Sequence, residues 1–402
     1  MGYAFTGRDV TLDVIGESVK VILSVDSVKF PLTGIARYTY ELAKQLQAQP
    51  DLDLTLLANG RAVAELPAHR QINPRKTDWL KSQLRKSDLV TKTYQMLSGI
   101  RNQISLKDHE DAIFHGPNFY LPIFNGYSVA TFHDLSIFTH AQYHTPARVR
   151  FMQRELSLTL QRASLLITDS EYTRQELANY FGYPLDKIHA IPLACSAEFH
   201  PRKATSTALT LDRFGLRHGG YVLYTGTIEP RKNIETLLDA YSILPDAIRR
   251  RWPLVLAGYH GWKSESLHAR IKAAASAGWV HYLGYVADDD LPYLFAGAHL
   301  FIFPSHYEGF GLPVLEALAS GVPVICSNAS SLPEVAGGAA LLFDPDDVSK
   351  LSELIITGLE DESWRGPAIN KGLEQASTFS WQKCAEETIA VYQELAGDNV
   401  FI

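Results

Sequence analysis

The sequence has few cysteines and no long apolar run, and both absences narrow the class of protein. Three cysteines, Cys195, Cys326 and Cys384, occur among 402 residues. Their odd number and wide spacing argue against a disulfide framework or a cysteine metal site and favour a reducing compartment. No stretch reaches the roughly 18 apolar residues that a spanning helix needs. The first residues, MGYAFTGRDVTLDVIGESVK, lack the basic stretch followed by a short apolar segment that is typical of a signal peptide. We therefore expect no secretory signal and a cytoplasmic protein.

The chain also lacks the excess of basic residues that is typical of nucleic-acid-binding proteins. It has 37 Lys and Arg against 44 Asp and Glu, a net charge of -7. We therefore expect no nucleic-acid partner. A single hydrophobic core stops growing at roughly 250–300 residues, so a chain of this length predicts two domains.

Short apolar runs alternate with amphipathic stretches, and this pattern occurs twice along the chain. Tyr127–Phe132 and Leu300–Phe303 are near-continuous apolar runs, whereas Gly34–Gln47 and Leu312–Ser320 have helical spacing. Buried strands separated by helices indicate parallel sheets that are covered on both faces. We predict an α/β fold of two doubly wound, Rossmann-like domains that face a central cleft.

The break between the domains is expected near Ile191–Arg202, where the apolar pattern stops between prolines. It divides the chain into residues 19–198, residues 199–380 and an amphipathic helical segment, residues 381–402. Ligands of open parallel sheets bind beyond the carboxyl ends of the strands, so the cleft is the expected site.

The segment His306–Ile325, HYEGFGLPVLEALASGVPVI, gives the strongest local signal. It follows an apolar strand and places Gly309 and Gly311 in a loop before a predicted helix. Free N–H groups at a helix start attract phosphate, glycines let the backbone approach a ligand, and carboxylates can hold sugar hydroxyls. Glu308 and Glu316 are eight residues apart, so both can face one ligand. The alternative is a tight loop with one solvated and one helix-capping glutamate.

Three further segments put polar residues at the ends of predicted strands. In TGTIEPRKN, the adjacent Arg231 and Lys232 can neutralise a diphosphate, or they form an ordinary solvated basic pair. VATFHD ends in His133 and Asp134, and a histidine hydrogen-bonded within a strand-end turn is the alternative there. In PLTGIARYTY, Gly34 opens a helix whose start could bind a second anion. No G-x-G-x-x-G pattern is present there, so dinucleotide binding is only weakly supported.

Together, five segments resemble the family 4 glycosyltransferases in sequence and in order. They are TGIARYT, FHDLS, TDSEYTR, GTIEPRKN and EGFGLPVLEALASGVPV, and the likeness extends from about residue 19 to residue 390. The resemblance implies a GT-B fold with an acceptor-binding domain at 19–198, a nucleotide-sugar-binding domain at 199–380 and a helix at 381–402 that crosses back. It also implies a retaining enzyme that moves a sugar from a nucleotide diphosphate donor to an acceptor.

The resemblance further implies roles for residues of this chain. Arg231 and Lys232 would contact the donor diphosphate, and His133 would lie beside the transferred sugar. Glu316 would bind the ribose hydroxyls, and Gly34 would let the N-terminal loop approach the diphosphate. Glu308 would hold the donor sugar and phosphate together with the backbone N–H groups of Gly309, Phe310, Gly311 and Leu312. The backbone near Tyr285 and Val286 would contact the nucleobase.

This chemistry needs no metal or other cofactor, because Arg231 and Lys232 face the charge that develops on the leaving diphosphate. Some relatives carry a further arginine where this chain has Thr227–Ile228, so Arg231 and Lys232 would carry the phosphate charge without it. The acidic triplet Asp288–Asp290 precedes a predicted helix, and N-capping accounts for it better than metal binding does. Same-face attack by the acceptor is favoured over a covalent carboxylate intermediate, and the sequence leaves both open.

The choice of donor and acceptor depends on a narrower resemblance. TGIARYT, HDLSIF and EPRKN together resemble bacterial mannosyltransferases of polysaccharide assembly, so GDP-mannose is the first choice, ahead of rhamnose, glucose and N-acetylglucosamine donors. The acceptor would be a glycan or lipid-linked glycan. A sugar-nucleotide epimerase of the same fold and a non-catalytic sugar-binding protein are the competing functions. The basic stretch Arg70–Lys107, interleaved with apolar residues, predicts contact with anionic lipid on the inner face of the cell membrane, with a solvated helical pair as the alternative.

Overall fold

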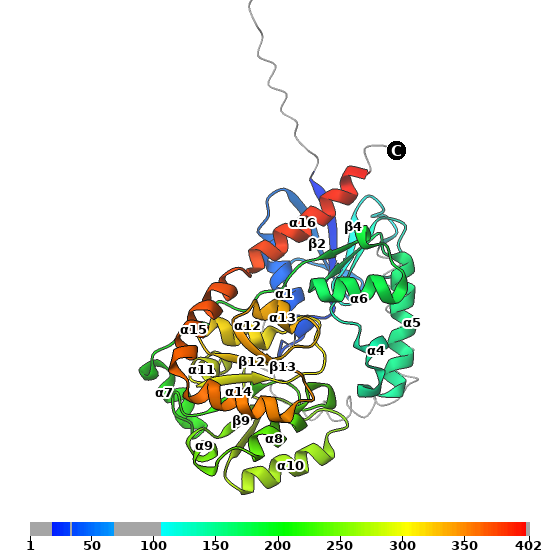
Figure 1. Ribbon diagram of the computed structural model, residues 1–402. Coiled ribbons are helices and arrows are strands. Elements are labelled where there is room, and N and C mark those ends of the chain that lie inside the picture. Colours follow the sequence, from blue (N-terminus) through cyan, green and yellow to red (C-terminus); the bar gives the residue numbers. More distant parts are fainter. Residues whose placement is uncertain (1–17, 33, 68–105, 399–402) are drawn as a thin grey trace, which may run out of the picture.

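The computed structural model describes residues 18–32, 34–67 and 106–398 and arranges them in two α/β units (Figure 1). Each unit is built on one sheet of mostly parallel strands. The strands are near-continuous apolar runs because helices cover both faces: every residue of β5 (Ser128–Phe132) and β8 (Val222–Thr225) is buried. The predicted class, two doubly wound parallel sheets, is confirmed.

The N-terminal sheet has seven strands in the order β3-β2-β1-β4-β5-β6-β7, and only β3 runs antiparallel to its neighbour. The order changes direction between β1 and β4, which is where open parallel sheets bind ligands. Its strands are β1 (Val19–Ser24), β2 (Leu52–Ala58), β3 (Arg61–Val63), β4 (Ile113–Gly116), β5, β6 (Leu165–Thr168) and β7 (Ile188–Ala190). Its helices are α1 (Gly34–Gln47), α4 (Ser136–Thr139), α5 (Pro146–Arg162) and α6 (Glu171–Phe181), with the short 3-10 turns η1 (Ala141–Tyr143) and η2 (Leu185–Lys187).

The C-terminal sheet has six parallel strands in the order β10-β9-β8-β11-β12-β13, and its order changes direction between β8 and β11. The strands besides β8 are β9 (Leu254–Ala257), β10 (Val280–Gly284), β11 (Leu300–Phe303), β12 (Val324–Ser327) and β13 (Ala340–Phe343). The helices are α7 (Ala204–Arg213), α8 (Ile234–Ser242), α9 (Asp246–Arg251), α10 (Glu265–Ser276), α11 (Leu291–Ala296), α12 (Leu312–Ala319), α13 (Leu332–Ala336), α14 (Val348–Glu360) and α15 (Glu362–Ser377), with the 3-10 turn η3 (Pro230–Lys232).

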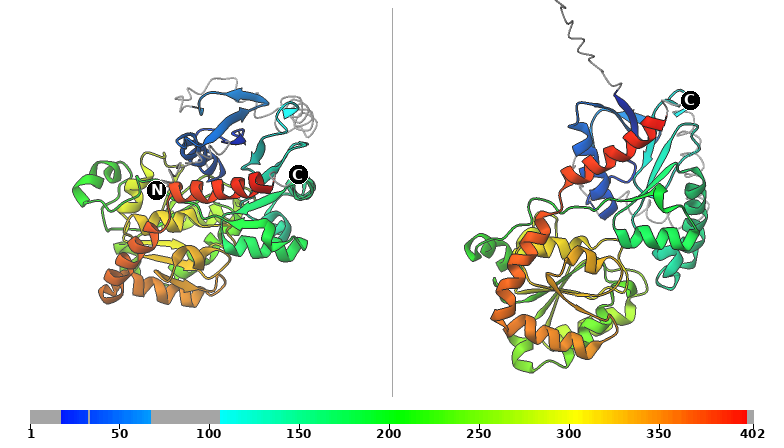
Figure 2. Two further views of the ribbon diagram at one scale, coloured as in Figure 1. Left: turned by 90° about the horizontal axis from the view of Figure 1, so that it is seen from above. Right: turned by 45° about the horizontal axis from the view of Figure 1, so that its top comes forward.

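The chain passes between the two units twice. The first passage follows β7, and the second joins α15 to the last helix, α16 (Trp381–Asp398). The backbone N–H of Lys383 donates to Ser380 Oγ at 3.1 Å, so the serine caps α16. Helix α16 leaves the C-terminal unit and packs on α1 and β1 (Figure 2).

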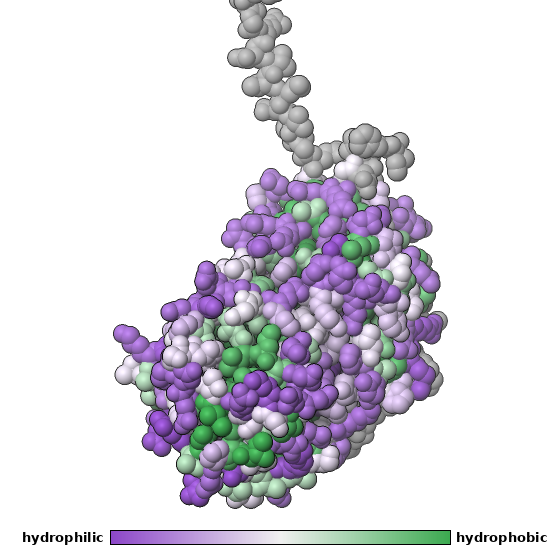
Figure 3. Space-filling model, viewed as in Figure 1, coloured by the Kyte–Doolittle hydropathy of each residue, from purple (hydrophilic) through white to green (hydrophobic). Residues whose placement is uncertain are grey.

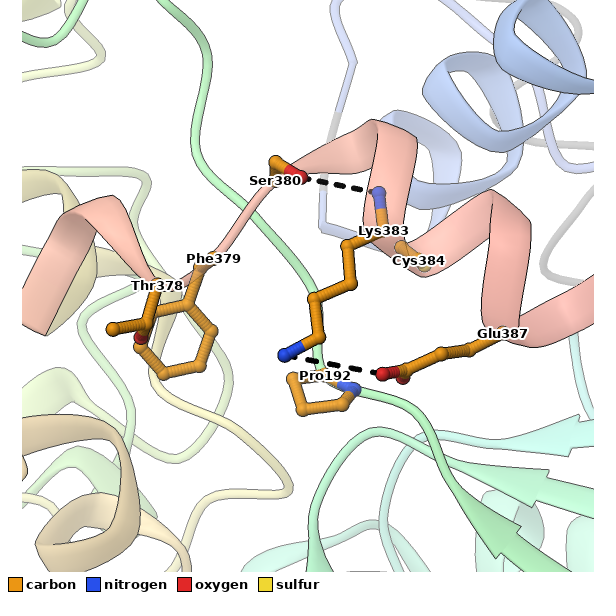
Figure 4. A pocket seen from close by; sticks show the side chains of 7 residues that line it. All are labelled: Pro192, Thr378, Phe379, Ser380, Lys383, Cys384 and Glu387. Atoms are coloured by element: carbon orange, nitrogen blue, oxygen red, sulfur yellow. Dashed lines mark hydrogen bonds and ion pairs between the residues drawn. The ribbon is translucent and has the colours of Figure 1, made fainter.

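A small cavity of about 70 Å³ lies where the two passages run side by side (Figure 4). Pro192 of the first passage and Phe379 of the second line it, together with Lys383 and Glu387 of α16. Lys383 Nζ lies 3.9 Å from Glu387 Oε1, and both side chains border the cavity. This cavity is far too small for a sugar nucleotide, so it marks the junction between the domains rather than the active site.

The face of the molecule that Figure 3 shows is mostly polar. In Figure 3 hydrophilic residues cover most of the visible face, and apolar residues show through in separate patches. Within the described ranges, the helices fall short of the length and apolarity that crossing a bilayer would require. Cys326 and Cys384 are buried, Cys195 is partly buried, and all three are free thiols.

Candidate active site

The helix start that was predicted to meet phosphate is present in the C-terminal unit. Helix α12 follows β11 after residues 304–311, here called the glycine loop. Gly311 has a φ of 120°, a conformation that strains other residues, and a proline lies in the first turn of the helix. A Cβ at Gly309 would lie 1.6 Å from the carbonyl oxygen of His133. The glycine loop therefore packs directly on the end of β5 in the other domain.

Glu308 of the glycine loop and the basic pair of η3 form one buried ion cluster. Lys232 Nζ donates to Glu308 Oε1 at 2.6 Å, and an Arg231 guanidinium nitrogen lies 3.0 Å from Glu308 Oε2. Burial alone would raise the pKa of Glu308, but Lys232 and Arg231 outweigh it and lower the pKa to about 2. The three residues follow β8 and β11, which are neighbours at the point where the strand order reverses. The structure thus brings together the residues predicted for the donor phosphates.

Glu229 belongs to the same cluster, and the sequence analysis assigned it no role. It is 1% exposed, and its Oε1 accepts a hydrogen bond of 2.9 Å from Arg231. Arg231 is therefore held between two carboxylates, while it also donates to the Tyr307 carbonyl oxygen at 2.5 Å. Burial raises the pKa of Glu229 despite the nearby Arg231 and Lys232. A glutamate two residues before the arginine was the available signal, but its spacing alone did not show that it points inward.

Glu316 has different charged neighbours from Glu308. It is buried on α12, and the groups whose charges act on it are Arg37 of α1 and Asp288. Burial raises the pKa of Glu316 to about 7, with Arg37 opposing this rise. Arg37 and Asp288 are themselves 3.7 Å apart across the gap between the domains. The sequence analysis missed Arg37, although it lies within the first turn of the helix that Gly34 opens.

His133 follows β5 and is buried with both ring nitrogens engaged inside the protein. Nδ1 lies 2.8 Å from Asp169 Oδ2, and Nε2 lies 2.8 Å from the Pro117 carbonyl oxygen. The Pro117 carbonyl oxygen can only accept, so Nε2 carries a proton, and Nδ1 donates to Asp169 when that carboxylate is ionised. Burial lowers the pKa of His133, but Asp169 outweighs it and raises the pKa overall. The atom of His133 that faces the glycine loop is the backbone oxygen, so the predicted contact of this residue with the sugar stays a prediction.

The other predicted donor contacts lie at the edges of the two domains. Tyr285 follows β10, is 45% exposed and stacks on Tyr259 with ring centroids 4.6 Å apart. Val286 beside it is buried. Gly34 is the first residue of α1, and a Cβ there would meet no atom of the described residues within 4 Å. Among the described residues, nothing therefore fills the space next to Gly34, and an aromatic surface is available next to Val286.

The acidic triplet Asp288–Asp290 does not act as predicted. Asp290 occupies the N-cap position of α11, but its carboxylate pairs with Arg213 and makes no hydrogen bond to the helix N–H groups. The predicted capping role is wrong because an arginine of α7 lies within reach of the carboxylate. In the parts of the chain that the structure describes, the triplet belongs to no group of three side chains placed to hold a metal ion. The independence from metal stays a prediction.

Two residues of the C-terminal unit hold a turn of the N-terminal unit across the gap. Trp262 Nε1 donates to the Tyr143 carbonyl oxygen at 2.6 Å. Lys263 Nζ donates to the carbonyl oxygens of Gln142 and His144, each at 2.9 Å. Three successive carbonyls around η1 are thus bound by two adjacent side chains, and the domains are closed on one another at this edge.

Comparison with known proteins agrees with this geometry. Two family models match, Glycosyltransferase Family 4 over residues 32–199 and Glycosyl transferases group 1 over residues 217–375. The chain is 44% identical to O-antigen chain mannosyltransferase B of Escherichia coli over 381 residues, which are 94% of this chain and 100% of the relative.

More distant similarities extend over part of the chain or over the fold alone. The serotype-specific mannosyltransferase WbdA of Escherichia coli is 34% identical over 241 residues, 58% of this chain and 29% of that protein. Among solved structures, WaaG, a glycosyltransferase involved in lipopolysaccharide biosynthesis, is similar with a TM-score of 0.67. That likeness has 16% identity over 92% of this chain and 99% of WaaG, so it concerns the fold.

Proposed function

The chain belongs to the family 4 glycosyltransferases and has their GT-B fold, and from this premise we propose that it transfers mannose from GDP-mannose. The acceptor is a glycan or lipid-linked glycan of a growing cell-surface polysaccharide. The observation that carries the proposal is the buried cluster of Arg231 and Lys232 around Glu308 at the strand-order switch point. The relative that matches along its whole length is named for mannosyl transfer to O-antigen chains, which supports the sugar.

The cluster suits departure of a nucleotide diphosphate. Negative charge grows on the leaving phosphate oxygen, and Arg231, Lys232 and the start of α12 offer positive charge and free N–H groups there. Arg231 and Lys232 can neutralise the negative charge of the leaving diphosphate, as a metal ion does in other enzymes. We therefore propose a reaction that needs no metal.

Retention of the anomeric configuration follows from attack on the face that the diphosphate leaves. A covalent intermediate would need a carboxylate with a free oxygen beside the sugar. Both oxygens of Glu308 are paired with cations, so this carboxylate has no free oxygen to act as a nucleophile. This favours same-face attack with the departing phosphate accepting the acceptor's proton.

The surface around Tyr285 supports a guanine base. The stacked rings of Tyr285 and Tyr259 are both close to half exposed and offer a flat face on which a purine can stack. Asp288 is near enough to both rings for its charge to raise the pKa of each tyrosine, although burial is the larger cause in both. Guanine presents two neighbouring N–H donors that a carboxylate can accept together, whereas uracil presents one.

A panel of nucleotide sugars tests the donor. GDP-mannose should give the highest kcat/KM among GDP-, UDP- and ADP-linked hexoses. Asp288→Asn should lose about tenfold or more in kcat/KM for the GDP donor, since an amide offers one acceptor oxygen where the carboxylate offers two. The exposed neighbour Asp289→Asn is the matched control and should leave the rate unchanged. Higher turnover of a UDP-linked sugar would contradict the proposed donor.

Measuring GDP release with and without acceptor distinguishes a glycosyltransferase from an epimerase and from a sugar-binding protein. A transferase releases GDP much faster when acceptor is present. An epimerase would convert the donor sugar without acceptor, and a sugar-binding protein would do neither.

We also propose a peripheral position on the inner face of the cell membrane. The basic stretch Arg70–Lys107 lies almost wholly outside the described residues, so this proposal rests on its sequence. A lipid-linked acceptor would make such a position useful, because the reacting glycan then lies at the membrane surface.

A further inference from the structure

A strained turn lies beside His133, in the loop that follows β4. Phe119 has a φ of 62°, and the backbone N–H of Tyr120 donates to the Asn118 carbonyl oxygen at 2.7 Å. This is a three-residue turn with its central residue in the left-handed region, which is rare for any residue other than glycine. Such strain persists only where the surroundings fix it, and it concentrates at functional sites.

The surroundings of the turn do fix it. A Cβ at Gly116 would lie 2.2 Å from the Tyr120 carbonyl oxygen, so glycine is needed there for the loop to fold back. The Phe119 ring packs edge-on against Phe132 and against His133, with centroids 5.7 and 5.3 Å away. The backbone N–H of Phe119 donates to the Thr131 carbonyl oxygen at 3.1 Å. One side of the loop is therefore anchored to the strand that carries His133.

The loop is anchored on its other side to α5. The Leu121 N–H donates to Thr159 Oγ1 at 3.3 Å, and Arg162 donates to the Leu121 carbonyl oxygen at 2.8 Å. With both sides held, the turn directs the Tyr120 side chain outward, where 36% of it remains exposed. The strain thus has a structural result, the presentation of one tyrosine next to the active site.

Tyr120 lies in a wall of aromatic and cationic side chains that continues toward the C-terminal domain. Its ring centroid is 6.4 Å from that of Phe151 on α5. Arg148, one turn earlier on α5, is close enough for its charge to act on the Tyr120 hydroxyl. The Arg148 guanidinium carbon in turn lies 5.5 Å from the ring centroid of Trp262 in the other domain. This wall has no part in the donor cluster, whose side chains come from the C-terminal domain.

We propose that Tyr120 and Arg148 bind the terminal sugar of the acceptor glycan. The apolar C–H face of a pyranose can pack on the tyrosine ring, and its hydroxyls can hydrogen-bond to the phenol and the guanidinium. Phe119, the residue before Tyr120, packs on His133, so an acceptor held on this wall lies on the N-terminal side of the site. The proposal rests on the proposed function, because it requires a glycan acceptor.

Steady-state kinetics of Tyr120→Ala test the proposal, with octyl-linked mannobiose as the acceptor probe. The acceptor KM should rise about tenfold or more, as for loss of one well-packed aromatic contact in a binding site. GDP binding and acceptor-free GDP release should not change. Tyr120→Phe should lie between wild type and Tyr120→Ala. The matched control is Tyr180→Ala, a more exposed tyrosine of the same domain, which should keep the wild-type acceptor KM.

Two results would overturn the subsite, namely an unchanged acceptor KM in Tyr120→Ala, or a loss of GDP binding in a variant whose melting temperature is preserved. If wild type does not turn over GDP-mannose, the proposed function fails, and calorimetric titration of the GDP-loaded protein with the octyl-mannobiose decides the subsite. Weaker binding to Tyr120→Ala than to wild type would then support it, and equal or absent binding would refute it.

Discussion

Tyr392 of the last helix and His115 of β4 are 277 positions apart in the chain, yet the tyrosine hydroxyl lies 2.6 Å from Nδ1 of the histidine. Both side chains are fully buried, and burial lowers the pKa of His115 to about 3, so its ring is neutral. His115 Nε2 is hydrogen-bonded to Thr131 Oγ1 at 2.9 Å, and Thr131 Oγ1 is hydrogen-bonded to the Tyr38 hydroxyl at 3.0 Å. A buried chain of polar groups therefore joins α16 to α1.

The last group of this chain, Tyr38, packs against His133. The two rings are edge to face with centroids 5.1 Å apart, so the chain of groups adjoins the end of β5. We expect Tyr392→Phe to cost about 1–3 kcal/mol of stability, because it leaves a buried His115 nitrogen without its partner. Turnover should fall while the donor KM changes little, and urea unfolding together with initial rates would show this. Wild-type stability in Tyr392→Phe would mean that water can replace the hydroxyl.

The Lys232–Glu308 pair carries the next prediction. Lys232→Ala and Glu308→Ala should each lower turnover by about 10²-fold or more, because the first removes positive charge from the leaving phosphate and the second removes the carboxylate that holds Arg231 and Lys232 in position. Circular dichroism would establish that the fold survives. Lys350→Ala is the matched control, since this lysine of α14 pairs with Glu353 at the surface, and it should behave as wild type. Near-normal turnover in a folded Lys232→Ala variant would remove Lys232 from its role.

Glu316 should make stability depend on pH. Its folded pKa of about 7 lies above the ordinary value of 4.5, so between these values the folded chain keeps a proton that the unfolded chain loses. The stability contribution is complete below about pH 4.5 and is lost as the pH rises to about 7. Glu316→Gln should therefore be more stable than wild type by about 1–3 kcal/mol at pH 8, and this advantage should shrink toward pH 5. A difference independent of pH would contradict the raised pKa.

The same substitution tests ribose binding. Ribose hydroxyls donate more strongly to an ionised carboxylate, so the donor KM of wild type should fall as the pH rises from 6 to 8. Glu316→Gln should have a raised donor KM at pH 8, little change in kcat and no such pH dependence. A large fall in kcat with an unchanged donor KM would place Glu316 in the chemical step instead.

The sequence was sufficient for the two parallel sheets and for the cluster of Arg231, Lys232 and Glu308. Short, near-continuous apolar runs between helices are typical of strands buried on both faces, and strand ends that carry polar residues meet at one edge of a sheet. The sequence was not sufficient for Glu229 and Arg37, because which way a charged side chain points depends on packing between segments far apart in the chain. The strain at Phe119 was equally invisible, since any residue type can precede an exposed tyrosine.

The acidic triplet shows a different kind of error. A helix-capping carboxylate and a carboxylate paired with an arginine of another helix have the same local sequence, so only the position of Arg213 on α7 distinguishes them. Asp290→Asn should cost less than about 1 kcal/mol, as expected for a solvent-exposed ion pair. Activity should be complete in the presence of a chelator and unaffected by this substitution. If activity disappears with EDTA and returns with manganese, the metal-independent reaction is wrong.

The last prediction concerns the membrane. Arg70–Lys107 contains nine basic and two acidic residues in a chain whose net charge is -7, and tryptophan, tyrosine and leucine are interleaved with the basic ones. Each basic residue near an anionic surface contributes up to about 1 kcal/mol, so the segment can hold the protein on such a membrane. We expect sedimentation with vesicles that contain phosphatidylglycerol, weaker binding at higher salt, and loss of binding when Lys81, Arg85 and Lys86 become glutamine. A matched variant with Lys272, Lys350 and Lys371 of the C-terminal domain changed to glutamine removes the same charge and should still bind. Equal sedimentation with neutral and anionic vesicles would refute the membrane position and would favour an acceptor that is free in solution.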